Sequence, residues 1–162
     1  MKTKLLPLFA IIVLFYGCQK NTNSSQTNSS QNSNPKTTST IQDNKKTVLD
    51  FYQKMFGDKD ISAVDQYIAP EYIQHNPNVA DGTEAFKKAA VKWFEGKPKT
   101  KIDVQHIAAE GDLVFLHIKN TRPDGGLKST IDIFRLKDGK IVEHWDVHQD
   151  VPEHSANNHP MF

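Results

Sequence analysis

The segment DIFRLKDGKIVEHWDVHQ, residues 132–149, predicts a β-hairpin near the C-terminal end of the chain. Asp138-Gly139 is typical of a two-residue type I′ turn, and strand-like sequence flanks it on both sides. A turn of this kind pairs Lys137 with Lys140, and counting outward from that pair fixes the register of the whole hairpin. The register then decides which side chains lie on the same face of the sheet.

Side chains along a strand alternate between the two faces of a sheet. The register predicts that His144, Asp146 and His148 share a face with Ile131 and Ile133. If that face is interior, desolvation raises the pKa of Asp146, and the two histidines can exchange protons with it. A carboxylate in an apolar cavity is one way to build an acid/base group that works near neutral pH.

The opposite face of the hairpin carries Glu143, Trp145 and Val147 together with Asp132 and Phe134. The register does not decide which of the two faces is the interior one. We expect Trp145 to pack in the core or in a subunit contact. Asp132 is the second candidate carboxylate, for the case in which this face lines the site.

Helical patterns precede the strands. They predict helices over residues 43–57, over 61–68, and from 81–83 to Gly96. A short strand is expected at 72–75, and further strands near 101–109, 113–120, 128–136 and 140–149. Helices followed by strands predict an α+β fold, with helices on one face of a mostly antiparallel sheet. A curved sheet wrapped on helices makes a cone, and a small-molecule pocket would form in its mouth or interior.

The N-terminus has the features of a secretory signal. Lys2 and Lys4 form a basic start, and an apolar run follows that is short for a membrane span. The run ends at Gly17-Cys18, where Cys18 is the single cysteine, so no intrachain disulfide can form. We therefore expect residues 1–17 to be a bacterial lipoprotein signal and Cys18 to carry the lipid. The localisation expected is the cell envelope, anchored to a membrane.

Residues 18–42 are dominated by Asn, Ser, Thr and Gln, which cannot bury a core, so they predict a disordered tether. The folded domain is expected over 43–162. Loss of residues 1–17 removes two lysines, which leaves 20 − 2 = 18 basic residues against 19 acidic ones. That balance argues against nucleic acid as a partner.

Three segments carry a resemblance to a known family. YIQHNPNVADG (72–82), DIFRLKDGKIVEHWDVHQ (132–149) and NNHPMF (157–162) resemble the SnoaL-like polyketide cyclases, and more narrowly their predicted aldol-condensation branch. The resemblance implies a nuclear transport factor 2-like (NTF2-like) cone, with three N-terminal helices packed on a strongly curved, mostly antiparallel sheet. It also implies a homodimer formed through the sheet.

Cyclases of this family close rings by intramolecular aldol condensation, without a metal or an organic cofactor. The resemblance implies that Asp146 is the catalytic acid/base and that His75, from YIQHNP, is a pocket residue. His75 or His144 would stabilise the oxyanion. Gln74 alternates away from His75 and is expected outside the site. The candidate substrate-binding residues are Tyr72, Asn76, Ile131, Ile133 and His148.

Two alternatives remain open at this stage. The same pocket could hold a small ligand and turn nothing over, as a binding or interaction module. A metal site could form from His144, Asp146 and His148, with His75 joining them. Three ligands on one straight strand face are spaced about 7 Å apart, so joint chelation needs a bend, and we expect no metal.

Overall fold

The computed structural model describes residues 35–162. The expected signal segment, Cys18 and most of the expected tether therefore lie outside the described residues. Helix α1 spans Pro35–Tyr52, so it begins well before Asp43, and the prediction that 35–42 form part of a disordered tether is wrong. Proline suits the first turn of a helix, and no glycine or further proline interrupts the chain between it and Asp43.

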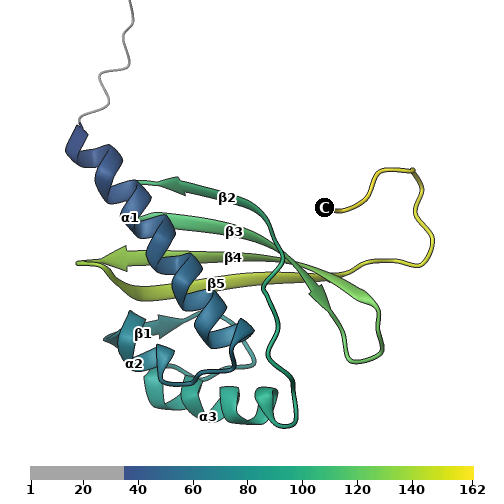
Figure 1. Cartoon of the computed structure of the whole chain (residues 1–162), viewed down its shortest axis with the longest axis horizontal. Coiled ribbons are helices and arrows are strands. Elements are labelled where there is room, and N and C mark those ends of the chain that lie inside the picture. The colour runs from purple at the N-terminus through teal and green to yellow at the C-terminus, as the bar shows by residue number, and fades with distance from the viewer. Residues whose placement is uncertain (1–34) are drawn as a thin grey trace, which may run out of the picture. The chain divides into compact units, whose positions relative to one another are not determined.

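The other elements follow the expected order (Figure 1). A single π-helical turn, η1 (Gln53–Gly57), ends the first helix; then come α2 (Ala63–Tyr67), β1 (Ile68–Gln74) and α3 (Thr83–Phe94). The last four strands are β2 (Val104–Glu110), β3 (Leu113–Thr121), β4 (Leu127–Lys137) and β5 (Lys140–Asp150). Strand β1 is longer than the expected 72–75 and passes through Pro70, which an edge strand tolerates.

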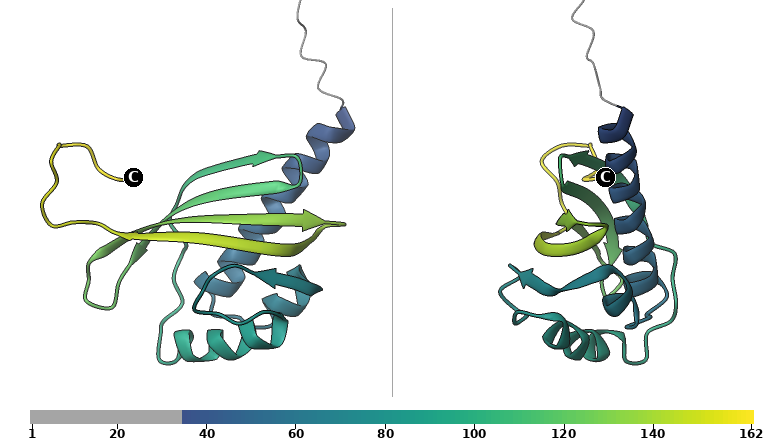
Figure 2. Two further views of the ribbon diagram at one scale, coloured as in Figure 1. Left: turned by 180° about the vertical axis from the view of Figure 1, so that it is seen from behind. Right: turned by 90° about the vertical axis from the view of Figure 1, so that its left-hand side faces the viewer.

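The five strands form one mixed sheet in the order β1-β5-β4-β3-β2. Strand β1 pairs with β5 in parallel, and the three remaining pairs are antiparallel. Helix α1 runs across one face of this sheet, and α3 lies near its β1 edge (Figures 1 and 2). The α+β prediction is confirmed. Within the described residues, no helix is long and apolar enough to cross a membrane.

The core lies between α1 and the inner face of the sheet. Phe51 is 1% exposed, and its ring contacts the rings of Phe56, Tyr67, Phe86 and Phe134. Strands β3, β4 and β5 supply the apolar side chains that close the core from the other side: Val114, Leu116, Ile118, Leu136 and Ile141. Helix α1 is therefore fixed across the sheet by aromatic packing.

The β4–β5 hairpin begins as predicted and then departs from prediction. Asp138 and Gly139 have φ of 51° and 75°, as a type I′ turn requires, and Lys137 pairs with Lys140. The register shifts after Leu136, because Val142 is an extra residue in β5. This β-bulge places two residues of one strand opposite a single residue of the other.

The bulge reverses the predicted pairing of faces. Asp132 pairs with Asp146, whereas Ile131 pairs with Val147 and Ile133 with Trp145. A one-residue slip moves every side chain to the other face, so the prediction that Ile131 and Ile133 lie beside Asp146 is wrong. The two isoleucines lie on the outer face of the sheet, away from the helices.

Candidate functional site

A cavity of about 420 Å³ opens between the inner face of the sheet, the end of α1 and the segment after β1. Its volume lies within the range of small-molecule sites. One wall is apolar and aromatic: Phe51, Tyr52, Phe56, Tyr72, Val79, Phe86, Trp93 and Phe134. The other wall is polar: Gln74, Asn76, Asn120, Thr121, Arg122, Lys128, Asp132, His144, Asp146 and His148, and Pro123 lies at the rim.

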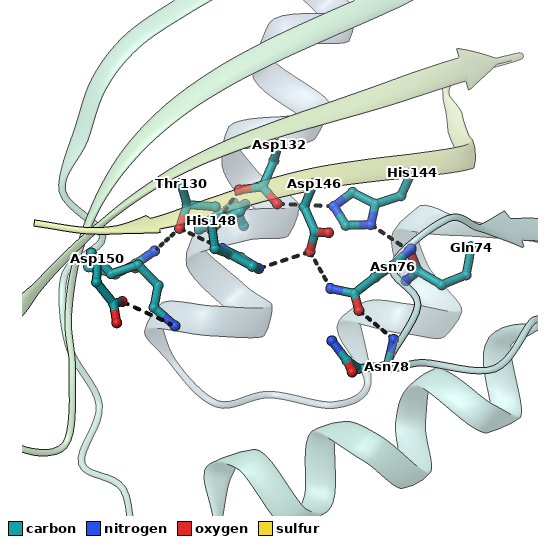
Figure 3. A network of polar contacts seen from close by, with 12 residues as sticks. Gln74, Asn76, Asn78, Thr130, Asp132, His144, Asp146, His148 and Asp150 are labelled. Atoms are coloured by element: carbon teal, nitrogen blue, oxygen red, sulfur yellow. Dashed lines mark hydrogen bonds and ion pairs between the residues drawn. The ribbon is translucent and has the colours of Figure 1, made fainter. Parts of the chain in front are cut away.

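Asp146 presents one free carboxylate oxygen to this cavity (Figure 3). Its Oδ2 accepts hydrogen bonds from Asn76 Nδ2 at 2.6 Å and His148 Nε2 at 3.1 Å. Its Oδ1 accepts none from the described residues. Burial raises the pKa of Asp146, but the bonds from His148 and Asn76 and the charges of His144 and His148 outweigh it. The net pKa lies below the usual value, so the carboxylate is ionised at neutral pH, and the predicted rise is wrong.

His144 lies between two hydrogen-bond acceptors. The backbone N–H of Asn76 donates to Gln74 Oε1 at 2.9 Å, which identifies that atom as the amide oxygen. His144 Nδ1 lies 3.0 Å from the same oxygen, so Nδ1 must carry a hydrogen. His144 Nε2 lies 3.0 Å from Asp132 Oδ1, and that contact needs a second proton. The Asp132–His144 pair therefore holds one proton more than a neutral imidazole beside a carboxylate.

Two tyrosines complete the buried network. Tyr52 Oη donates to the other oxygen of Asp132 at 3.0 Å. Burial, followed by the charge of Asp132, raises the pKa of Tyr52 well above its usual value, so Tyr52 stays a donor. Gln74 Nε2 donates to Tyr72 Oη at 3.0 Å. Burial and the charges of Asp146 and Asp132 likewise raise the pKa of Tyr72.

His148 can carry one proton or two. Its Nε2 bonds Asp146, and its Nδ1 lies 2.9 Å from Thr130 Oγ1, which also accepts a bond from Asn120. A hydroxyl can donate to a neutral imidazole or accept from a charged one. The bond to Asp146 raises the pKa of His148 more than burial lowers it. The imidazolium is therefore favoured up to a higher pH than in an ordinary histidine.

The Asp146–His148 pair makes stability depend on pH in a stated direction. The raised pKa of His148 stabilises the fold fully below about pH 6.5, its ordinary value, and this stabilisation is lost as pH rises through the folded pKa. The lowered pKa of Asp146 stabilises above about pH 4, and this is lost as pH falls through its folded pKa. We expect the pair to contribute most between these limits.

Urea unfolding of His148→Asn across pH 5 to 9 checks this. The variant should lose the fall in stability that wild type shows on the alkaline side, whereas His154→Asn, in the exposed C-terminal segment, should keep it. An unchanged alkaline limb in His148→Asn would contradict the pairing.

Five of the residues proposed from the sequence line the cavity: Asp146, His144, His148, Tyr72 and Asn76. Ile131, Ile133 and His75 do not. His75 lies on the outer face, where its ring stacks on Trp145 and its Nε2 is 2.9 Å from Glu143 Oε1. The assignment of His75 to the pocket is corrected, because alternation along β1 turns Gln74 inward and His75 outward.

The sequence predicted Gln74 outside the site and made Asp132 only the second candidate carboxylate, yet both residues line the cavity. The signal for Gln74 was available, since it shares strand parity with Tyr72 and therefore lies on the same face. The signal for Asp132 was hidden by the bulge at Val142, which reversed the predicted faces.

A divalent cation would find three candidate ligands together. Asp132, His144 and Asp146 offer ligand atoms that lie within 4.8 Å of one another. The set suggested by the sequence contained His148 and His75 in place of Asp132. In the structure His75 lies on the outer face, and His148 Nε2 is hydrogen-bonded to Asp146 Oδ2. A cation would also have to displace the proton that Asp132 and His144 share, so the geometry as it stands is that of a hydrogen-bonded acid/base cluster.

Comparison with protein families matches residues 46–153 to the SnoaL-like polyketide cyclases. The chain belongs to this family. No curated protein matches the sequence. The SnoaL-like chain is similar in structure to wild-type IdmH from Streptomyces antibioticus, with 21% identity and a TM-score of 0.54, over 65% of this chain and 91% of IdmH.

Two further solved structures support the fold. AclR from Streptomyces galilaeus has 22% identity and a TM-score of 0.57, with 67% of this chain and 90% of AclR covered. An NTF2-like protein from Burkholderia xenovorans LB400 has 19% identity and a TM-score of 0.59, with 71% and 89% covered. At these identities the likeness shows the fold, which is NTF2-like.

Proposed function

We propose that this SnoaL-like domain is a cofactor-independent acid/base enzyme that acts on a small carbonyl compound by aldol condensation or cyclisation. The observation that carries the proposal is the free Oδ1 of Asp146, an ionised oxygen in a cavity, next to the proton-bearing Asp132–His144 pair. A base and a proton donor side by side are what enolisation of a carbonyl compound requires.

Asp146 Oδ1 would take the proton from the carbon next to the carbonyl group. The electron pair of that C–H bond becomes the enolate, whose oxygen would accept a hydrogen bond from His144 Nε2–H. In the free site that hydrogen donates to Asp132 Oδ1, so the two oxygens would share it. The enolate carbon then attacks a second carbonyl carbon of the same molecule, and a new C–C bond forms. The proton held by Asp146 passes to the resulting alkoxide, which restores the carboxylate.

The rest of the cavity suits this chemistry. Asn76 and His148 hold Asp146 Oδ2, so only one oxygen is available to the substrate. The aromatic wall would receive the apolar part of the substrate and exclude water from the enolate. A pure binding module would use the same wall and leave Asp146 idle, so the test must measure proton removal as well as binding.

Solvent exchange tests the proposal without knowledge of the natural substrate. The protein, dialysed against a chelator, is incubated in D₂O with a panel of cyclic and aromatic ketones and diketones, and deuterium uptake next to the carbonyl group is followed by NMR. We expect catalysed exchange for compounds that fit the cavity. Binding without exchange anywhere in the panel would favour the binding module, and exchange that requires added metal would replace the acid/base scheme.

We also propose that the protein is held at the cell envelope by lipidated Cys18 and dimerises through the outer face of the sheet. The apolar residues Ile131 and Val147, 36% and 65% exposed, support such a contact, since the helices cover the other face. Fractionation of cells that express the full chain, followed by light scattering of the extracted protein, checks both points. Recovery in the aqueous fraction would contradict the anchor, and a monomeric mass would contradict the dimer.

A further inference from the structure

The chain leaves the sheet at the point where two cavity residues are placed. Gln74 is the last residue of β1 and pairs with His144, so His75 and Asn76 lie beyond the strand. The backbone N–H of His75 still donates to the carbonyl of His144 at 2.9 Å. The Gln74 backbone N–H also donates to Asp81 Oδ1 at 2.7 Å, and Asn76 Oδ1 accepts from the Asn78 backbone N–H at 2.8 Å, so local polar contacts hold part of this segment.

The outer face supplies a further restraint, through the His75 side chain. The His75 ring lies parallel to the Trp145 ring, with an interplanar angle of 5° and centroids 4.7 Å apart. His75 Nε2 lies 2.9 Å from Glu143 Oε1. Both partners are residues of β5, so the His75 side chain joins the end of β1 to β5 through two different contacts.

The partners of His75 are themselves held in place. Glu143 Oε2 accepts a bond from Arg135 Nε at 2.8 Å, and the Arg135 guanidinium lies over the Trp145 ring, 5.6 Å from its centroid. Arg135 also bonds Asp112, at the turn between β2 and β3. We call His75, Glu143, Trp145 and Arg135 the outer clasp. Its other three members belong to β4 and β5, so it links the His75 side chain to the sheet.

The residues on either side of His75 are those that set the cavity groups. Gln74 accepts from His144 Nδ1, and Asn76 donates both to Gln74 through its backbone and to Asp146 through its side chain. Side chains alternate along an extended chain. Contacts that hold the His75 side chain on the outer face therefore keep the Gln74 and Asn76 side chains directed into the cavity. The same alternation on β5 places Glu143 and Trp145 outside, with His144 and Asp146 inside.

We propose that His75 is a positioning residue: through the outer clasp it holds Gln74 and Asn76 in the orientation that orders Asp146 and His144 in the cavity. Its importance for catalysis rests on the proposed function, but its effect on the cavity does not. The role differs from that of a pocket histidine, since the imidazole touches no cavity atom and acts through the backbone.

NMR of the full domain with ¹³C-labelled aspartate carboxyls tests the proposal without any substrate. In His75→Ala the bond from Asn76 to Asp146 should loosen, so Asp146 should titrate at higher pH than in wild type, and the His144 Nδ1 proton should exchange faster. His75→Gln, which can still donate to Glu143 but cannot stack, should fall between the two. An unchanged Asp146 titration in folded His75→Ala would overturn the proposal.

His106→Ala is the matched control. It removes an exposed imidazole whose Nδ1 bonds His117 on the neighbouring strand β3, at the β2 edge far from β1. The control should leave both Asp146 and His144 signals unchanged; an equal shift in it would also overturn the proposal. If His75→Ala fails to fold, His75→Gln serves as the test. An Asp146 titration in that variant that matches wild type would overturn the proposal. Failure of the carbonyl exchange assay would leave these titrations untouched, so the two proposals stand or fall separately.

Discussion

Asp146→Asn is expected to lower turnover by about 10²- to 10⁴-fold and to keep the fold. The amide has nearly the same volume as the carboxylate, and its oxygen can still accept from Asn76 and His148 at the position of Oδ2. The amide nitrogen then occupies the position of Oδ1, where it cannot take a proton. General-base catalysis contributes about 10²- to 10⁴-fold, so kcat/KM, or the rate of solvent exchange, should fall by that factor.

The matched control is Asp150→Asn. Asp150 is on the same strand, but its exposed side chain does not contact Asp146; it forms ion pairs with Arg122 and Lys128, which also line the cavity. This control should retain turnover within about twofold, because solvent-exposed ion pairs contribute little. Near-normal turnover in Asp146→Asn would remove the base from the mechanism, and retained ligand binding in that variant would then favour a binding module.

The stability of Asp146→Asn must be known before its activity is compared. The surroundings of Asp146 hold its pKa below the usual value, which means that they stabilise the ionised form more than the neutral one. A neutral amide forfeits part of that stabilisation at neutral pH. Circular dichroism and urea unfolding should show a folded protein of slightly lower stability, and assays belong well below its unfolding temperature.

The sequence predicts much of this fold because its signals are local. The Asp138-Gly139 turn and the order of helices before strands depend on residues close together in the chain, and both are confirmed. The bulge at Val142 has no such signal, because valine suits a regular strand as well as a bulged one. One unseen residue was enough to give Asp146 the wrong neighbours on β4. The direction of its pKa shift was wrong for another reason, because hydrogen bonds from His148 and Asn76 and the charges of the two histidines outweigh burial.

The candidate site illustrates the same limit. Three residues of the motif YIQHNP line the cavity, Tyr72, Gln74 and Asn76, and His75, between the last two, faces outward. Residue type alone suggests that the histidine is the residue that lines the site. The alternation of side chains along the strand can instead place its two neighbours there. Which parity faces inward depends on how β1 pairs with β5, and that parallel pairing joins segments distant in the sequence.

Asp132→Ala is expected to destabilise the fold strongly. Asp132 is 5% exposed and is the partner of both His144 Nε2 and Tyr52 Oη, so its loss leaves two buried polar groups without a partner. Removal of one member of a buried pair costs about 3–5 kcal/mol, out of about 5–15 kcal/mol for a whole domain. Urea unfolding at neutral pH measures the change.

Two substitutions give this prediction its controls. Asp150→Ala, which removes an exposed aspartate at the end of β5, should lower the free energy of unfolding by no more than about 1 kcal/mol. Asp132→Asn should retain most of the stability, because its amide can donate to a neutral His144 and accept from Tyr52. A loss in Asp132→Ala no larger than that in Asp150→Ala would show that water already reaches the pair and that it is not buried.

Asp132→Asn then separates stability from chemistry. A neutral amide at this position removes the need for the second proton on His144, so the proton donor of the proposed mechanism is lost while the packing remains. Turnover should fall, and the double variant with Asp146→Asn should lose less than the product of the two single losses, because base and donor serve the same enolate. Losses that multiply independently would mean that the two carboxylates act in different steps.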